Sequence, residues 1–164
     1  MILYHAVSIY QLLECLVHRT IYHKNEKAIF LTMDFMQRRL GERYGLLKEF
    51  FYEILIYGNQ DTACVDELAG NGYALSDFTK IYVACAHGWF GIYLCEHHIP
   101  FIFMEDGVGA ISQPEILIKV QHPGIRTEKG IEYGLFSGEN ENIVKCICNM
   151  KHQRDGYTNV KAEH

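Results

Sequence analysis

The 164-residue sequence predicts an α/β fold with a doubly wound, mostly parallel sheet and helices on both of its faces. Two observations lead to this prediction. Short runs rich in apolar residues alternate along the chain with segments of helical periodicity. The strand-like runs are almost continuously apolar, as expected for parallel strands that helices cover on both sides.

Composition narrows the class of protein. Hydrophobic residues make up 49% of the chain and charged residues 21%, which excludes a disordered or low-complexity protein. A chain of this length buries about 70% of its unfolded surface, enough for a core without metals or disulfides. The net charge of −5 argues against a general nucleic-acid binder, which needs a basic surface.

The six cysteines do not form a recognisable disulfide framework. Four lie inside apolar runs, and only Cys146 and Cys148 are close together in sequence. The first residues lack the basic flank and apolar run of a signal peptide, and no stretch approaches the length of a spanning helix. We therefore expect free thiols and a cytoplasmic protein, with peripheral contact with the inner face of a membrane left open.

The first strand is predicted at residues 2–4, and the clearest helix follows it. Ser8 and Gln11 form the pattern of a capping box at the helix start. Apolar residues then recur at offsets of three, four, seven and eight, which gives one stripe on a 3.6-residue period. The stripe contains Ile9, Leu12, Leu13, Leu16, Val17 and Ile21.

The remaining elements follow from similar patterns. Further strands are predicted at residues 27–32, 51–57, 80–85 and 100–104. Helices are predicted at residues 35–47, where two glycines interrupt the pattern, and at 61–68, 87–98 and 112–120. After these, a short strand is expected around residues 133–136 and a last helix at 141–150. The elements make one domain at residues 1–152, with 153–164 as a polar tail or the start of a linker to a second domain.

Ligands of open parallel sheets bind beyond the carboxyl ends of the strands, so the polar residues that follow each strand are the candidate site. They are His5 and Ser8, Thr32 and Asp34, residues 58–60, His87 and Gly88, and residues 105–109.

Glu105 and Asp106 are the most informative of these residues. Two adjacent carboxylates directly follow an apolar strand, and Gly107 and Gly109 then allow a sharp turn. Like charges at the edge of a low-dielectric core raise the pKa of one carboxyl, which suits a general base that deprotonates a hydroxyl. The alternatives are a strand-to-helix turn with an acidic cap, and a Mg²⁺ site.

The other motifs are weaker evidence of a functional site. A G-x-G-x-x-G fingerprint is absent, because Ser112 stands where the third glycine would be. His122 before Pro123 could hold a phosphate or serve as a general acid, and the simpler interpretation is a helix stop with proline just beyond it. Cys146-x-Cys148 with His152 lacks a second ligand pair for zinc, so no metal site is predicted. Cys85 and His87 are spaced like a nucleophile and its base, without a visible third group.

The stretch FIFMEDGVGAIS, with its acidic–acidic–glycine motif at residues 105–107, resembles the motif of bacterial sialyltransferases and polysialyltransferases, including glycosyltransferase family 52. The opening strand–helix–strand unit is similar in style to that of such capsule and lipooligosaccharide enzymes. The resemblance covers about residues 2–125. It implies two Rossmann-like domains in a GT-B arrangement and metal-independent, inverting transfer from a nucleotide sugar, commonly CMP-sialic acid, to a glycan acceptor.

The resemblance also implies roles for particular residues. The first acidic position of the motif is the proposed base, which maps to Glu105, with Asp106 beside it. His122 and Pro123 match the family's histidine–proline motif, which holds or protonates the donor phosphate. We assign Gly107, Gly109, His5, Ser8 and His122 to substrate binding, and no cofactor is expected.

By this analogy the chain is the amino-terminal, acceptor-side half of a transferase for capsule or surface polysaccharide. We expect little transfer of sugar by the 164-residue chain alone. The competing interpretation is a non-catalytic binding or assembly domain in which the acidic turn is only structural. The sequence does not indicate an oligomeric state.

Overall fold

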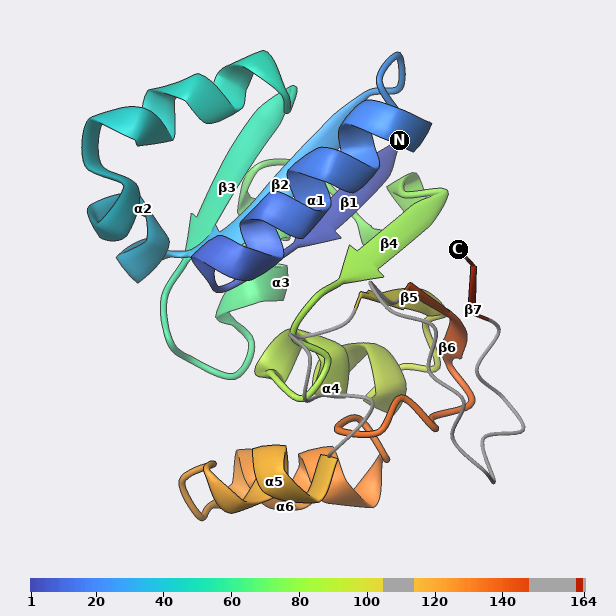
Figure 1. The fold of residues 1–164 in the computed structure, drawn as a ribbon. Helices are drawn as coiled ribbons and strands as arrows, with labels where there is room; N and C mark the ends of the chain where they lie inside the picture. The colour runs from blue at the N-terminus through green and yellow to red at the C-terminus, as the bar shows by residue number, and fades with distance from the viewer. Residues whose placement is uncertain (105–113, 148–161, 164) are drawn as a thin grey trace. The chain divides into compact units, whose positions relative to one another are not determined.

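The computed structural model describes residues 1–104, 114–147 and 162–163 (Figure 1). Its contacts divide the chain into two compact units, Met1–Tyr82 and Val83–His164. The paired strands of both units run parallel and are linked through helices. This confirms the predicted α/β, Rossmann-like fold. The predicted domain limits, 1–152 and 153–164, stay a prediction.

The first unit is built on four strands, β1 (Ile2–His5), β2 (Ala28–Met33), β3 (Glu53–Tyr57) and β4 (Lys80–Val83), in the order β3-β2-β1-β4. β1 and β2 are adjacent and in register from Ile2 opposite Ala28 onward. All four residues of β1 and the first five of β2 are buried. The two central strands therefore form the core of this unit, as their apolar sequences predict.

The helices of the first unit lie on two faces of these strands. They are α1 (Ile9–Tyr22), α2 (Asp34–Leu40), α3 (Ala63–Gly70) and the 3₁₀ segments η1 (Gly41–Glu49) and η2 (Leu75–Asp77). The chain steps from β1 to β2 to β3 in one direction, then returns past both to β4. Since parallel crossovers are right-handed, this reversal places α3 on the face opposite α1. Figure 1 shows α1 in front of β1 and β2, and α3 behind them.

α1 begins where its capping residues predict. The Ser8 hydroxyl accepts a hydrogen bond from the Gln11 amide at 3.2 Å. The return bond differs from that of a standard capping box, because the Gln11 side chain accepts from the amide of Val7, one residue earlier, at 2.7 Å. Gln11 is buried, so this bond also satisfies a polar side chain inside the protein.

The apolar stripe of α1 does not coincide with its buried face. Gln11, Leu12, Cys15 and Arg19 are the buried residues, and only Leu12 of them belongs to the stripe. The rest of the stripe is half-buried or exposed. The sequence therefore predicts the helix correctly, whereas the side that faces the strands is set by tertiary packing.

The second unit contains β5 (Phe101–Met104), β6 (Ile143–Ile147) and β7 (Ala162–Glu163), paired in parallel in that order. Its helices are α4 (Trp89–Glu96), α5 (Pro114–Lys119) and α6 (Ile125–Glu132). Phe101 and Phe103 of β5 are fully buried, and so are most residues of α4. The structure therefore confirms the strand predicted at residues 100–104 and the helix predicted at residues 87–98.

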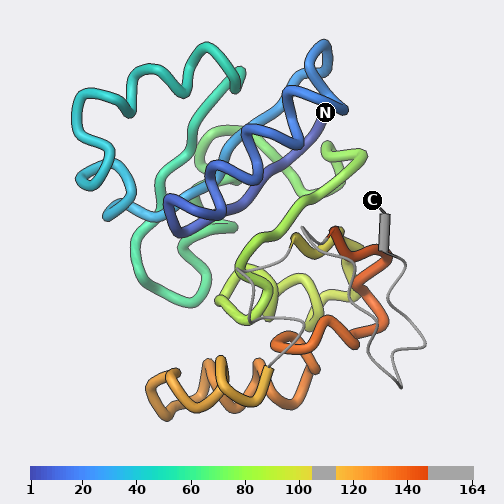
Figure 2. The backbone as a smooth tube through the Cα atoms, in the orientation of Figure 1, coloured from blue at the N-terminus to red at the C-terminus, as the bar shows by residue number. Residues whose placement is uncertain are grey.

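Two predictions for this unit are wrong. Residues 133–136 are not a strand but part of a turn after α6 (Figure 2). In this turn the backbone amide of Glu139 donates a hydrogen bond to the carbonyl of Gly134. Residues 143–147 form β6 and not a helix. Ile143 and Val144 are β-branched, which favours an extended backbone, and parallel pairing with β5 from Phe101 opposite Ile143 onward makes the segment a strand.

The start of α4 packs unusually close to the backbone that precedes it. A Cβ added to Gly91 would lie 1.9 Å from the carbonyl oxygen of Ala86. Only glycine permits this approach, so Gly91 fixes how α4 leaves the turn after β4.

Candidate functional site

The carboxyl ends of β1, β2 and β3 bring together three side chains from the first unit. His5 Nε2 lies 2.6 Å from the hydroxyl of Tyr57, and the two rings stack at 5.8 Å. Thr32 donates its hydroxyl to the carbonyl of Ala6 at 2.7 Å. These bonds join the ends of three neighbouring strands into one rigid floor.

His5 is buried at the bottom of this region. Burial lowers the pKa of its imidazole to about 3, so the ring is neutral near pH 7. A neutral, buried ring offers a hydrogen bond but no positive charge for a phosphate. The substrate-binding role assigned to His5 stays a prediction, and in this geometry it would act through Tyr57.

Ser8 and Asp34 follow β1 and β2 and are half-buried. Ser8 caps α1, as described above. Asp34 begins α2 and pairs with Arg38 one turn later at 2.9 Å. Both side chains therefore have structural contacts at helix starts, where an oxygen acceptor stabilises the first turn.

The residues that follow β3 are exposed. Gly58, Asn59 and Gln60 turn away from the strand, with the Gln60 amide donating to the Gly58 carbonyl at 3.0 Å. The amide side chains of Asn59 and Gln60 can donate and accept hydrogen bonds, which suits hydroxyl-rich ligands such as sugars. The floor and these amides form the candidate site of the first unit.

The turn after β4 holds the pair predicted from Cys85 and His87. Cys85 Sγ lies 3.7 Å from His87 Nε2, and both residues are buried. The imidazole stacks on Phe136 at 4.6 Å. Burial, together with the charge of Arg126, lowers the pKa of His87 to about 4. The pair is close enough to share a proton, and both groups are shielded from solvent.

Glu105, Asp106, Gly107 and Gly109 lie outside the described residues. The strand that precedes them, β5, is a buried parallel strand that ends at Met104. β5 directly precedes the motif in the sequence, and the roles of the motif's residues stay predictions.

His122 is exposed in the turn between α5 and α6. Its carbonyl accepts the hydroxyl of Thr127 at 2.8 Å, and Gly124 caps α6 two residues later. This is the arrangement expected of a helix stop. A phosphate-binding role for the exposed ring stays a prediction.

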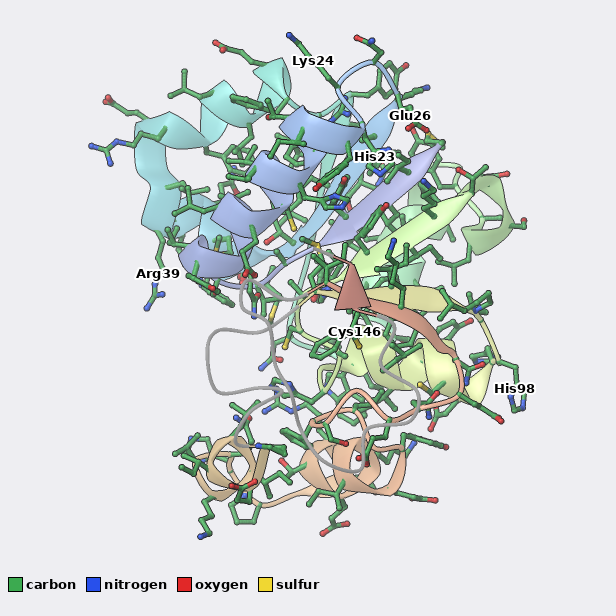
Figure 3. The ribbon with its side chains drawn as sticks, turned by 45° about the vertical axis from the view of Figure 1, so that its right-hand side comes forward. His23, Lys24, Glu26, Arg39, His98 and Cys146 are labelled. Carbon is green, nitrogen blue, oxygen red and sulfur yellow. The ribbon has the colours of Figure 1, made fainter. Side chains whose placement is uncertain are left out.

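A second polar cluster, which sequence reasoning missed, lies where β2 begins. Tyr82 of β4 bonds His23 Nε2 through its hydroxyl at 2.7 Å, and Glu26 bonds Nδ1 of the same ring at 2.5 Å. The hydrogen bond from His23 lowers the pKa of the Glu26 carboxyl. Figure 3 shows His23 and Glu26 next to each other past the end of α1. Burial raises the pKa of Tyr82 to about 12, so its hydroxyl stays protonated.

Tyr4 and His18 extend this cluster through the core. The Tyr4 hydroxyl and His18 Nδ1 are 2.8 Å apart, and the Tyr4 ring stacks on Tyr82 at 4.7 Å. Burial raises the pKa of Tyr4. His23 and Glu26 are three residues apart, but the other partners lie 14 to 78 residues apart in sequence, so no local pattern could have revealed the cluster. Glu26, His23 and Tyr82 form a carboxylate–imidazole–phenol chain. Because its phenol is buried and stays protonated, this chain is suited to holding the core together and not to acting as a nucleophile.

The structure describes five cysteines, which are buried and form no disulfide with one another: Cys15, Cys64, Cys85, Cys95 and Cys146. Cys148 and His152, the other members of the zinc motif considered above, lie outside the described residues. In the described part of the chain, no three His, Cys, Asp or Glu side chains gather as metal ligands would. Nor does any helix of that part have the length and apolar character needed to cross a membrane.

Comparison with models of protein families, with characterised proteins and with solved structures gave no match. The fold and the candidate residues are thus the basis for a functional proposal.

Proposed function

We propose that this chain is the acceptor-side domain of a nucleotide-sugar-dependent glycosyltransferase of the sialyltransferase type, acting in bacterial surface polysaccharide synthesis at the inner face of the membrane. The observation that carries the proposal is the position of the acidic motif. β5, the strand that precedes Glu105 and Asp106 in the sequence, is a buried parallel strand that ends at Met104, and ligands of open parallel sheets bind beyond the carboxyl ends of their strands.

In this proposal Glu105 or Asp106 takes a proton from an acceptor hydroxyl. The resulting oxygen nucleophile attacks the anomeric carbon of the donor sugar from the face opposite the nucleotide. The bond to the nucleotide phosphate breaks, and the electron pair leaves with that phosphate, so the configuration inverts. The contribution of the protein is a positioned carboxylate and an ordered acceptor.

Two features of the first unit agree with acceptor binding. The exposed Asn59 and Gln60 offer amide groups that pair with sugar hydroxyls, and they lie beyond a rigid floor formed by Tyr57, His5 and Thr32. The floor is neutral, which fits a hydroxyl-rich acceptor better than a diphosphate.

The proposal is tested by comparing Glu105→Gln and Asp106→Asn in the complete product of the gene. Transfer from CMP-sialic acid and from other nucleotide sugars to a panel of glycans would be measured by mass spectrometry. Loss of the base is expected to lower kcat by about 10²- to 10⁴-fold and to remove the acidic limb of the pH profile.

Glu132→Gln, which changes an exposed carboxyl at the end of α6, is the matched control and should leave kcat unchanged. If both motif variants retain full activity, the carboxylates are not the base. If they lose stability without any transfer being detectable in the unaltered protein, the motif is a structural turn. The second candidate, a non-catalytic assembly domain, would then be favoured, and the exposed apolar side of α1 agrees with it.

A further inference from the structure

The outward side of α1 is apolar along the whole helix. Five large hydrophobic side chains on it are exposed, with exposed fractions that rise from 37% to 65% toward the end of the helix. This α1 apolar face consists of Ile9, Tyr10, Leu13, Val17 and Ile21.

The α1 apolar face has a regular geometry. Ile9, Leu13, Val17 and Ile21 are spaced by four residues, so they form one row about 20 Å long on the helix surface. The opposite side of α1 already packs on the strands through Leu12 and Cys15. The row therefore contributes little to the core, and a soluble protein gains no stability by exposing it.

The end of α1 adjoins a group of lysines. Arg19 Nε donates to the Phe50 carbonyl at 2.6 Å, and its Nη2 donates to the Glu26 carbonyl at 2.7 Å. These bonds hold residues 23–27 and 50–52 against the end of the helix. Around this junction lie three exposed lysines, which we call the lysine rim: Lys24, Lys27 and Lys48.

Aromatic side chains lie among these cations. Phe50 is 39% exposed and Tyr52 65% exposed, and Lys27 Nζ lies 3.4 Å from the centre of the Tyr52 ring. Figure 3 shows Lys24 pointing away from the protein past the end of α1. Aromatic rings and lysines beside an aliphatic row are the composition of surfaces that sit at a membrane interface.

The distribution of charge along the chain agrees with this composition. Residues 1–52 contain seven basic and five acidic side chains, whereas residues 53–164 contain eight and fifteen. Of the acidic groups near the lysine rim, Glu26 is bonded to His23, Glu49 follows Lys48, and Glu14 is half-buried on α1. The part of the chain that contains α1 and the lysine rim, residues 1–52, is thus net positive by two, whereas the rest of the first unit is acidic.

We propose that the α1 apolar face and the lysine rim dock the first unit onto an anionic lipid bilayer. The aliphatic row enters the boundary between headgroups and acyl chains, and the lysines contact the lipid phosphates. A second copy of this chain fits less well, because pairing two rows would cover the aliphatic side chains but leave the lysine rim without an anionic partner, whereas an anionic bilayer contacts both. This docking deepens the membrane location given in the proposed function, but Glu105 and Asp106 play no part in it, so docking and sugar transfer can be tested separately.

The test is cosedimentation of the full chain with vesicles of phosphatidylcholine alone or with 30% phosphatidylglycerol. We expect binding to the anionic vesicles that weakens with salt. Leu13→Gln with Val17→Gln should weaken it at least tenfold, because two half-exposed aliphatic side chains are lost. Lys24→Gln should weaken it about fivefold, the effect of one lysine at an anionic surface.

Matched controls are Ile125→Gln with Ile131→Gln, an equally exposed aliphatic pair on α6, and Lys119→Gln. These variants and Glu105→Gln should bind to the anionic vesicles as the unaltered chain does. Circular dichroism is used to check that every variant folds. The proposal is overturned if the unaltered chain does not bind to the anionic vesicles. It is overturned as well if the α1 variants bind to these vesicles as tightly as the α6 variants do. It is also overturned if the lipid-free chain is a dimer that Leu13→Gln with Val17→Gln dissociates, since a second copy would then be the occupant.

Discussion

Two buried histidines of the first unit are held by tyrosine hydroxyls, His5 by Tyr57 and His23 by Tyr82. Each pair joins residues more than fifty positions apart, so each is a tertiary crosslink as well as a means of satisfying a buried polar atom. The cost of removing one partner exceeds the net value of the bond, because the remaining atom stays buried without water.

Tyr82→Phe is therefore expected to lower the free energy of unfolding by about 1–3 kcal/mol, since His23 Nε2 loses its partner inside the protein. Urea unfolding followed by circular dichroism measures the change. Tyr22→Phe is the control, because that tyrosine is 61% exposed. Equal stability of the two variants would show that the Tyr82 hydroxyl is not needed.

The buried histidines also predict how stability depends on pH. Burial holds the pKa of His5 at about 3 and that of His87 at about 4, below the value of about 6.5 in the unfolded chain. Between the folded and the unfolded pKa values, the unfolded chain therefore binds more protons than the folded chain does. The contribution of these two neutral histidines to the free energy of unfolding is fully present above pH 6.5. It falls as the pH drops toward 4, by up to about 1.4 kcal/mol per pH unit for each histidine.

Urea midpoints measured between pH 7.5 and 4.5 test this expectation. His87→Gln should make the slope shallower by one proton, while His122→Gln, which changes an exposed ring, should leave it unchanged. A slope that is the same in all three proteins would mean that His87 titrates normally in the folded state.

At the scale of elements, the turn from β4 into α4 depends on a single glycine. Gly91→Ala would place a Cβ 1.9 Å from the backbone of Ala86, so the helix must shift. We expect a loss of about 3 kcal/mol, at the upper end of overpacking effects. Gly70→Ala is the matched control at the end of α3, where nothing lies within 4 Å of the added Cβ and the helix gains up to about 1 kcal/mol.

Thermal unfolding of the two glycine variants gives the comparison. A Gly91→Ala protein as stable as the Gly70→Ala protein would show that α4 accommodates the added methyl by moving. The close packing of α4 on Ala86 would then not be required for the fold.

Strands and helices differ in how well their sequences predict them. Residues 28–31 and 101–104 are short apolar runs, and both are strands. Residues 143–147 form neither a continuous apolar run nor a segment whose burial alternates with a period of two, so their sequence does not predict the strand that they form. Pairing with β5 decides that segment, and that pairing joins residues about forty positions apart.

At the scale of the molecule, the buried central strands predict where the first unit is most resistant to opening. β1 and β2 are buried along nearly their whole length, whereas three of the five residues of β3 are only half-buried. Amides of Leu3, Tyr4 and Ile29–Leu31 should exchange with deuterium most slowly, and those of β3 faster. Exchange measured by mass spectrometry would contradict this if the β3 peptides were as protected as those of β2.

The sequence by itself determined the alternation of strands and helices, the start of α1 at Ser8 and the position of the acidic motif after an apolar strand, because these depend on neighbouring residues. Only the tertiary structure decided which side of α1 is buried, and that His23 meets Tyr82 and His5 meets Tyr57. Those outcomes depend on strands that are distant in the chain but adjacent in the sheet. Hydrophobic periodicity marks an apolar side of a helix, but it does not specify what that side will contact.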